Sequence, residues 1–118
     1  MKDNILRNKS YNFALRIVKT YQFICSEKKE YILSKQLLRS GTSIGANIEE
    51  AIGGQSDKDF LSKLTIAYKE ARESHYWIRL LKDSAYLTEK QADSLLKDNQ
   101  ELLKIIGAIQ KTMKNRKT

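Results

Sequence analysis

The sequence predicts an all-α protein that folds as an antiparallel up-down-up-down four-helix bundle. Its 118 residues contain no proline, the strongest helix breaker, and only five glycines. Apolar residues recur three and four positions apart through four separate segments, which is the spacing of one helical face. The connections between these segments are short, so successive helices are expected to be antiparallel neighbours. A chain of this length fits a single domain over residues 1–118.

The first helix is expected over about residues 5–26. Asn4 and Ser10 both fit as its N-cap, so the pattern leaves its start open. A charged run, EKKE, follows its end. Cys25 is the only cysteine, so an internal disulfide is excluded. We expect its side chain to be buried and to pack as a small apolar group. The apolar stripe of this helix comprises Ala14, Ile17, Val18, Tyr21, Ile24 and Cys25.

The second helix, over about residues 34–52, carries an unusual number of poor helix formers. Gly41 and Gly45 lie four apart on one face, and each costs about 0.5–1 kcal/mol relative to alanine in a helix interior. We expect close packing against a second helix to compensate for this cost. Ser34 is expected to cap the start of the helix. The Gly-Gly pair that follows it is expected to end it through a left-handed residue.

Capping boxes introduce the third and fourth helices. The third is expected over about residues 57–84, because Ser56 is followed three positions later by the acid Asp59. The fourth is expected over about residues 89–113, after the sequence TEKQ, in which Thr88 is the cap.

The sequence lacks the features of several functional classes. No window approaches 18 consecutive apolar residues, and the N-terminus lacks the apolar core of a signal peptide, so we expect no membrane partner and a cytoplasmic location. One histidine and one cysteine are too few for a zinc site. We find neither a serine with a local base nor a glycine-rich phosphate loop. The sequence therefore predicts no enzymatic activity, no cofactor and no metal.

A row of polar residues interrupts the apolar pattern of the second helix. Arg39, Ser43 and Asn47 are spaced by four and share one face. Because an unpaired buried charge costs several kcal/mol, Arg39 is expected to pair with Glu73 or Glu70 and to fix the register of the helices. A polar ligand pocket is the competing interpretation. The whole set, here called the polar seam, comprises Arg39, Ser43, Asn47, Glu50, Glu70 and Glu73.

A second apolar set, Tyr76, Trp77 and Leu80, lies beside the main stripe of the third helix. One helix of a four-helix bundle buries one broad stripe, so we interpret this additional aromatic patch as an oligomer interface. The alternative is a core face wide enough to include it.

Positive charge is concentrated near both ends of the chain. Residues 1–39 carry nine Lys/Arg against three acids (+6), residues 40–101 eight against eleven (−3) and residues 102–118 five against none (+5), which gives the net charge of +8. The two basic regions would meet if the first and last helices are neighbours. Such a surface attracts polyanions, nucleic acid above all, although lysine-rich faces also serve only to keep proteins soluble.

The second helix resembles a known family signature. Residues 37–51 (LLRSGTSIGANIEEA) resemble that of the 23S rRNA-intervening-sequence proteins, bacterial four-helix-bundle proteins of which some are labelled S23 ribosomal protein. Ala51 departs from the pattern, because many members carry glycine after the glutamate. The resemblance covers about residues 5–110, and its other parts are residues 9–11, 13–14, 59–61, 67–73 and 76–77.

The resemblance implies a small basic bundle that binds nucleic acid without catalysis. Similar proteins are accessory factors of diversity-generating retroelements, which assemble as pentameric barrels and contact a reverse transcriptase. The resemblance therefore implies that this protein is a homo-oligomer, a pentamer in form. It also implies a reverse transcriptase or another protein as partner. The ribosomal label is compatible with a gene position inside the ribosomal RNA gene, without a place in the ribosome.

The leading hypothesis is an oligomeric protein that binds RNA or other nucleic acid electrostatically. We find no RNA-recognition signature that would read bases. The runner-up is a protein-interaction adaptor or assembly subunit that does not bind nucleic acid directly. The bases expected to contact phosphates lie towards the two ends of the chain: Arg7, Lys9, Arg16, Lys19, Lys104, Lys111, Lys114, Arg116 and Lys117.

Overall fold

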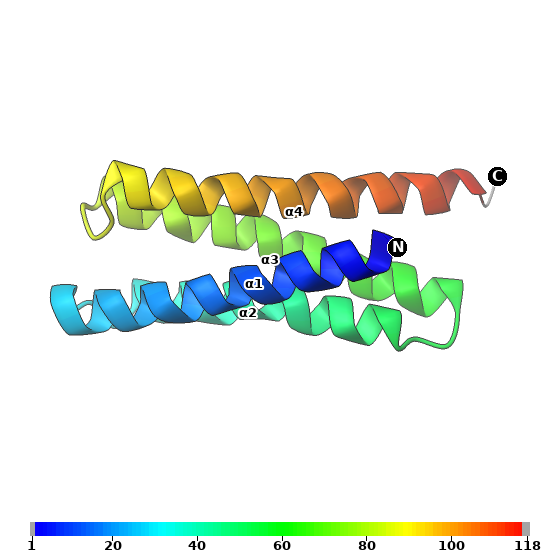
Figure 1. The fold of residues 1–118 in the computed structure, drawn as a ribbon, viewed down its shortest axis with the longest axis horizontal. Helices are drawn as coiled ribbons and strands as arrows, with labels where there is room; N and C mark the ends of the chain where they lie inside the picture. The colour runs from blue at the N-terminus through cyan, green and yellow to red at the C-terminus, as the bar shows by residue number, and fades with distance from the viewer. Residues whose placement is uncertain (1, 117–118) are drawn as a thin grey trace.

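The structure, a computed structural model, describes the backbone of residues 2–116 and the side chains of residues 5–116. Four α-helices lie side by side in a rod of 49 × 22 × 21 Å. Successive helices run in opposite directions, so that α1 begins and α4 ends at the same end of the rod (Figure 1). No strand occurs within the described backbone. The predicted all-α, up-down-up-down bundle is confirmed.

The first helix, α1 (Lys2–Phe23), continues into a single π-helical turn, η1 (Ile24–Lys28), and the chain leaves it through Lys29 at φ 55°. Of the predicted stripe, Ile17 and Ile24 are fully buried, whereas Ala14, Val18, Tyr21 and Cys25 are only half-buried. Large residues such as Phe13 and Ile17 fill the interior. The residues that follow them, Ala14 and Val18, are only half-buried. Two adjacent positions were apolar at each turn, and the larger side chain occupies the core.

The second helix, α2 (Leu33–Ile52), is capped by Glu30, and the prediction that Ser34 caps it is wrong. The Glu30 carboxylate accepts the backbone N–H groups of Ile32, Leu33 and Ser34 at 2.9, 2.8 and 2.8 Å. Burial opposes ionisation, but these donors outweigh it and hold the pKa of Glu30 below its ordinary value. A carboxylate satisfies three exposed N–H groups where a serine hydroxyl satisfies one. Ser34 is instead buried within the first turn.

Gly41 and Gly45 allow α1 and α2 to pack closely, as the sequence predicted. A Cβ atom at Gly41 would lie 2.7 Å from Cγ1 of Ile17, and one at Gly45 would lie 3.3 Å from the carbonyl oxygen of Ser10. Both glycines are buried. The conformational cost of glycine in a helix is therefore offset by contacts that no larger residue allows.

Two glycines do end α2, but the expected left-handed conformation is absent. Gly53 has φ −81°, and no described glycine has a positive φ. The N–H groups of Gly53 and Gly54 instead donate to the carbonyl oxygens of Glu49 and Ala51, both at 3.1 Å. A Cβ atom at Gly54 would lie 3.1 Å from that oxygen of Ala51, so this position is closely packed against the end of α2.

Both predicted cap residues start the remaining helices, Ser56 with a single cap bond and Thr88 with a full capping box. At the start of α3 (Asp57–Asp83), the Ser56 hydroxyl accepts the N–H of Asp59 at 3.1 Å. At the start of α4 (Glu89–Arg116), Thr88 and Gln91 each accept the other's backbone N–H, at 3.1 and 2.9 Å. Two reciprocal bonds satisfy two otherwise unpaired donors.

Buried polar contacts join the helices inside the core. The hydroxyls of Ser40 and Ser74 are hydrogen-bonded at 2.8 Å between α2 and α3. Asn99 of α4 donates through Nδ2 to the carbonyl oxygen of Ala71 of α3 at 3.0 Å. These three side chains are fully buried. They link the helices from inside, whereas the predicted polar seam lies nearer the surface.

Candidate nucleic-acid interface

Three of the predicted phosphate-binding residues, all on α1, are in ion pairs with carboxylates of neighbouring helices. Nε of Arg7 lies 2.7 Å from Glu49 of α2. On the other side of α1, Nζ of Lys9 lies 3.1 Å from Glu101 and a guanidinium nitrogen of Arg16 lies 2.6 Å from Asp98, both on α4. The first and last helices are therefore neighbours, as the charge argument required. Their contact, however, brings bases of α1 against acids of α4.

The other predicted bases differ in their surroundings. Lys19 is exposed on α1. Arg116 has an acid, Asp57, only at 4.0 Å, and Lys117 lies outside the described residues. Of the predicted bases on α4, Lys104, Lys111 and Lys114 are exposed and have no ion pair in the described structure.

Four lysines of α4 recur at intervals of seven residues: Lys90, Lys97, Lys104 and Lys111, here called the lysine stripe. Every member is exposed, and none has an ion pair among the described side chains. Seven residues are close to two helical turns, so the stripe runs along one face for about 31 Å. It lies opposite the buried face of α4, which includes Ala92, Asn99 and Ile106. Lys90 and Lys97 were missed as candidates, although the seven-residue spacing is visible in the sequence.

A groove between α3 and α4 adjoins this face. It encloses about 420 Å³ and is here called the α3–α4 groove. Arg72 and Arg79, two turns apart on α3, are the only arginines with described side chains that have no carboxylate within 4.0 Å. No acidic residue lines the groove. Its lining residues are Tyr68, Arg72, His75, Tyr76, Arg79, Gln100 and Leu103.

The positive potential of this groove acts on His75, which lies between the two arginines. Burial lowers the pKa of His75 below its ordinary value, and the charges of Arg79 and Arg72 lower it further. These effects favour the neutral imidazole of His75. The negative charge of an anion in the groove would oppose the two arginines and raise the pKa of His75.

The predicted aromatic set does not form one continuous exposed patch. Tyr76 is 52% exposed and lines the α3–α4 groove. Trp77 and Leu80 are half-buried, and Trp77 packs against the core. The rings of Tyr76 and Trp77 meet edge to face with centroids 5.0 Å apart. Trp77 therefore belongs to a widened core face, which was the alternative interpretation, and Tyr76 is the exposed member of the set.

The polar seam consists of separate contacts. Arg39 bonds both Glu70, at 3.2 Å, and Glu73, so each expected partner is engaged. Nε1 of Trp77 donates to the same Glu73 carboxylate at 2.9 Å. This bond lowers the pKa of Glu73, burial opposes it, and Arg39 lowers it further. The Arg39 side chain is 49% exposed, so the premise that it is buried is wrong.

The remaining seam residues form contacts of their own. Asn47 donates to the carbonyl oxygen of Ser43 one turn earlier at 2.9 Å. Glu50 pairs with Lys63 of α3 at 2.9 Å, at the far end of α2. The seam therefore links α2 to α3 at two places, and Ser43 and Asn47 bond locally between them.

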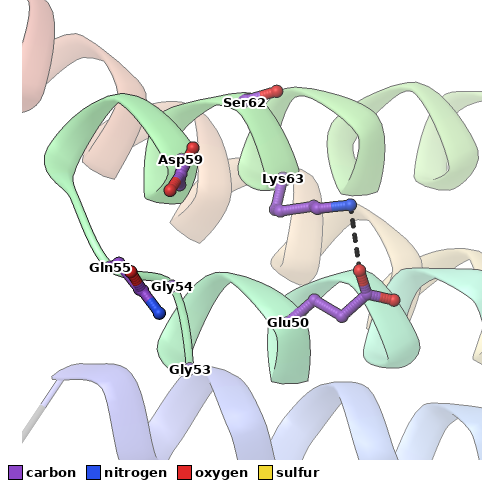
Figure 2. A pocket seen from close by; sticks show the side chains of 7 residues that line it. All are labelled: Glu50, Gly53, Gly54, Gln55, Asp59, Ser62 and Lys63. Atoms are coloured by element: carbon purple, nitrogen blue, oxygen red, sulfur yellow. Dashed lines mark ion pairs between the residues drawn. The ribbon is translucent and has the colours of Figure 1, made fainter.

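Another depression, of about 500 Å³, lies at the α2–α3 connection. Figure 2 shows Lys63 extending from α3 to Glu50, with the Ser62 side chain directed elsewhere. This pair leaves Asp59 as the other charged residue of the lining, which also includes Gly53 and Gly54. The α3–α4 groove differs from this depression in having two arginines and no acidic residue in its lining.

Two further features bear on the classes of function. Among the described residues, no three His, Cys, Asp or Glu side chains are grouped so that they could hold a metal ion. None of the described helices combines the length and apolar character needed to cross a membrane.

A protein-family model described as 23S rRNA-intervening sequence protein matches residues 2–108. The chain belongs to this family. The resemblance carried by residues 37–51 is thereby confirmed.

A solved relative of the 23S rRNA-intervening sequence protein family agrees with this assignment. The crystal structure of a protein of unknown function from the S23 ribosomal protein family of Bacteroides thetaiotaomicron VPI-5482 has 51% sequence identity and a TM-score of 0.92. The match covers 94% of this chain and 99% of that one. A search of curated proteins gives no match. Neither the family description nor that of the relative states an enzymatic activity.

Proposed function

We propose that the protein binds RNA or other nucleic acid electrostatically, without catalysis, through the face formed by α3 and α4. The observation that carries this proposal is the lysine stripe. Its four ammonium groups follow one helix for about 31 Å, and none of them has a described carboxylate within 4.0 Å. Cations that are free in the folded protein can exchange places with the counterions of a phosphate backbone, which favours binding. The net charge of +8 acts in the same direction.

The paired bases of α1 contribute less to this proposal than the sequence suggested. Arg7, Lys9 and Arg16 would have to leave a carboxylate to reach a phosphate. The exchange replaces one charge contact with another, so its net gain is small. These residues serve chiefly to join α1 to its neighbours.

The exposed apolar residues of α1 support the proposal that the protein is a homo-oligomer. Ile5, Tyr11 and Leu15 are 51%, 61% and 46% exposed, and helical periodicity places Tyr11 and Leu15 opposite the buried face of α1. Large exposed apolar side chains on one face are typical of protein contacts. Light scattering during gel filtration measures the number of subunits. The double variant Tyr11→Asp, Leu15→Asp should reduce the molecular mass, and an unchanged oligomer would exclude this face.

The same apolar face favours a second candidate function, that of an adaptor that binds a different protein, such as a reverse transcriptase. A pull-down from the host after nuclease treatment distinguishes the two. An adaptor retains its partner after nuclease treatment and shows no affinity for purified RNA. A nucleic-acid-binding protein loses RNA-bridged partners and binds the purified RNA.

Fluorescence anisotropy with labelled RNA over a range of salt concentrations tests the leading proposal. The logarithm of affinity should fall steeply with the logarithm of salt, by about 0.7–0.9 for each phosphate neutralised. Salt-independent binding in the millimolar range would contradict the proposal.

Two triple variants with equal loss of charge localise the interface. The stripe variant Lys97→Gln, Lys104→Gln, Lys111→Gln should reduce the salt slope by about 2–3, because three contacts are removed. The α1 variant Arg7→Gln, Lys9→Gln, Arg16→Gln should change the slope by less than about 1. Equal reductions of the salt slope in the two variants would show that affinity depends only on the total charge of the protein. Thermal unfolding of both variants controls for stability.

A further inference from the structure

We propose that the α3–α4 groove binds an unpaired nucleotide, so that the protein prefers single-stranded nucleic acid over duplex. Arg72 and Arg79 would hold phosphates, and the exposed ring of Tyr76 would stack on a base. This inference rests on the proposed function and deepens it by naming the form of the ligand. The lysine stripe gives affinity for any phosphate backbone, whereas the groove would discriminate between strand types.

The groove has the size and chemistry for this ligand. Its volume of about 420 Å³ falls within the range of roughly 300–1,000 Å³ that is usual for small-ligand sites. Arginine suits phosphate because its planar guanidinium donates two parallel hydrogen bonds to one anion. Four of the described arginines, including Arg7 and Arg39, have carboxylate partners, and the two in the groove do not. Two unpaired guanidinium groups in one groove are therefore an exception within this protein.

The positions of the aromatic residues point to base stacking. Tyr76 is exposed, but its ring is held edge to face against Trp77. Trp77 is fixed in turn by its bond to Glu73, which also bonds Arg39 of α2. This chain of contacts extends from α2 to the rim of the groove and holds the tyrosine ring in place. Aromatic rings beside a basic groove bind single strands because every base offers a stacking face.

Duplex nucleic acid cannot use this arrangement. Its bases are stacked on one another and are not available to a side chain unless they are flipped out. A duplex would therefore contact the lysine stripe and the arginines but not the tyrosine. The predicted preference arises from Tyr76, and a single substitution tests it.

The full-length protein is titrated with a short fluorescein-labelled oligouridine and with an RNA duplex of the same length. Wild type should bind the single strand about tenfold more tightly. Tyr76→Ala should remove this preference by weakening single-strand binding about tenfold while duplex affinity stays the same. Tyr76→Phe keeps the ring and should retain the preference. Arg72→Gln with Arg79→Gln should weaken binding of both ligands, and the single strand by the larger factor.

The only tryptophan provides an independent signal. Trp77 lies 5.0 Å from the Tyr76 ring, so unlabelled oligouridine should change its fluorescence more than the duplex does at equal saturation. The stripe variant Lys97→Gln, Lys104→Gln, Lys111→Gln should lower the affinity for both ligands by the same factor. At saturation it should still show the change in tryptophan fluorescence.

Three outcomes would overturn the inference. Equal affinity for both ligands in wild type, with no effect of Tyr76→Ala, would reject the groove and leave the proposed function intact. A lower oligomer mass for Tyr76→Ala would assign the tyrosine to a protein interface. Absence of binding to either ligand at low salt would reject the proposed function and the inference together.

Discussion

The paired bases of α1 and the bases of the α3–α4 face differ in their surroundings. Arg7, Lys9 and Arg16 each contact a carboxylate on a neighbouring helix. Arg72, Arg79 and the lysine stripe have no such partner among the described side chains. The first group joins helices, and the second is free to meet a polyanion. The pairing of charges, and not their number in a segment, therefore locates a candidate interface.

The packing of the two regions differs as well. Between α1 and α2, glycine permits contacts that leave no room for a methyl group. Between α3 and α4, a Cβ atom at Gly107 would lie 3.6 Å from Cε1 of Tyr68, which is an ordinary contact. The structural side of the molecule is tightly packed, and the α3–α4 side leaves space at its surface.

The largest effect on stability is expected from alanine at these glycines, with opposite signs. Gly41→Ala places a methyl group against Ile17 and should destabilise the protein by about 1–2 kcal/mol, the overpacking cost less the gain in helix propensity. Gly107→Ala should stabilise it by about 0.5–1 kcal/mol, because only the propensity changes. Urea denaturation measures both. Loss of stability in both variants would show that the two sides are packed alike.

A smaller effect is expected from the cap of α2. Glu30→Gln should destabilise the protein by about 1 kcal/mol at neutral pH, because the charge that favours three N–H donors is lost. The folded-state pKa of Glu30 is lowered, so its contribution is present above the unfolded pKa of about 4.3 and is lost as pH falls through the folded value. The difference in Tm between wild type and variant should therefore shrink below about pH 4. A difference that is constant with pH would contradict a charged cap.

His75 should make nucleic-acid binding depend on pH. Its pKa is lowered in the free protein, first by burial and then by Arg79 and Arg72. A bound phosphate raises that pKa, so binding takes up a proton and affinity should increase about threefold between pH 7.5 and 5.5. It is the only histidine, and His75→Gln should remove this dependence. A dependence that persists in His75→Gln would assign the titration to another group.

The smallest effect is expected at Arg39, where α2 meets α3. Its side chain is 49% exposed, and exposed ion pairs contribute about 0–1 kcal/mol. Arg39→Met should therefore lower stability by less than about 1 kcal/mol and leave the assembly intact. Thermal unfolding and light scattering measure the two properties. A loss above about 3 kcal/mol would indicate that Arg39 acts as a buried charge that fixes helix register.

Local patterns in the sequence predicted the fold well. The absence of proline, the helical spacing and the capping residues Ser56 and Thr88 determine contacts within a few residues, so they can be read directly. The close packing at Gly41 was predictable because glycine inside a helix requires a compensating contact. The cap of α2 was missed because a glutamate four residues before Ser34 is an uncommon cap, and serine is the usual one.

The candidate site was harder to predict, because its charges are balanced over long distances in the chain. Lys9 and its partner Glu101 are 92 residues apart, and Arg16 and Asp98 are 82 apart. No local pattern reveals such pairs. The lysine stripe, by contrast, is visible as a seven-residue repeat in the sequence, and the unpaired state of Arg72 and Arg79 emerged only from the packed structure.

Lysine acetylation footprinting, read by mass spectrometry with and without bound RNA, tests the assignment of the interface most directly. Each lysine is compared with itself in the two states, so an oligomer interface present in both does not affect the result. RNA should protect Lys97, Lys104 and Lys111 from acetylation and leave Lys9 unchanged. Protection of Lys9 and Lys19 without protection of the stripe would place the interface on α1.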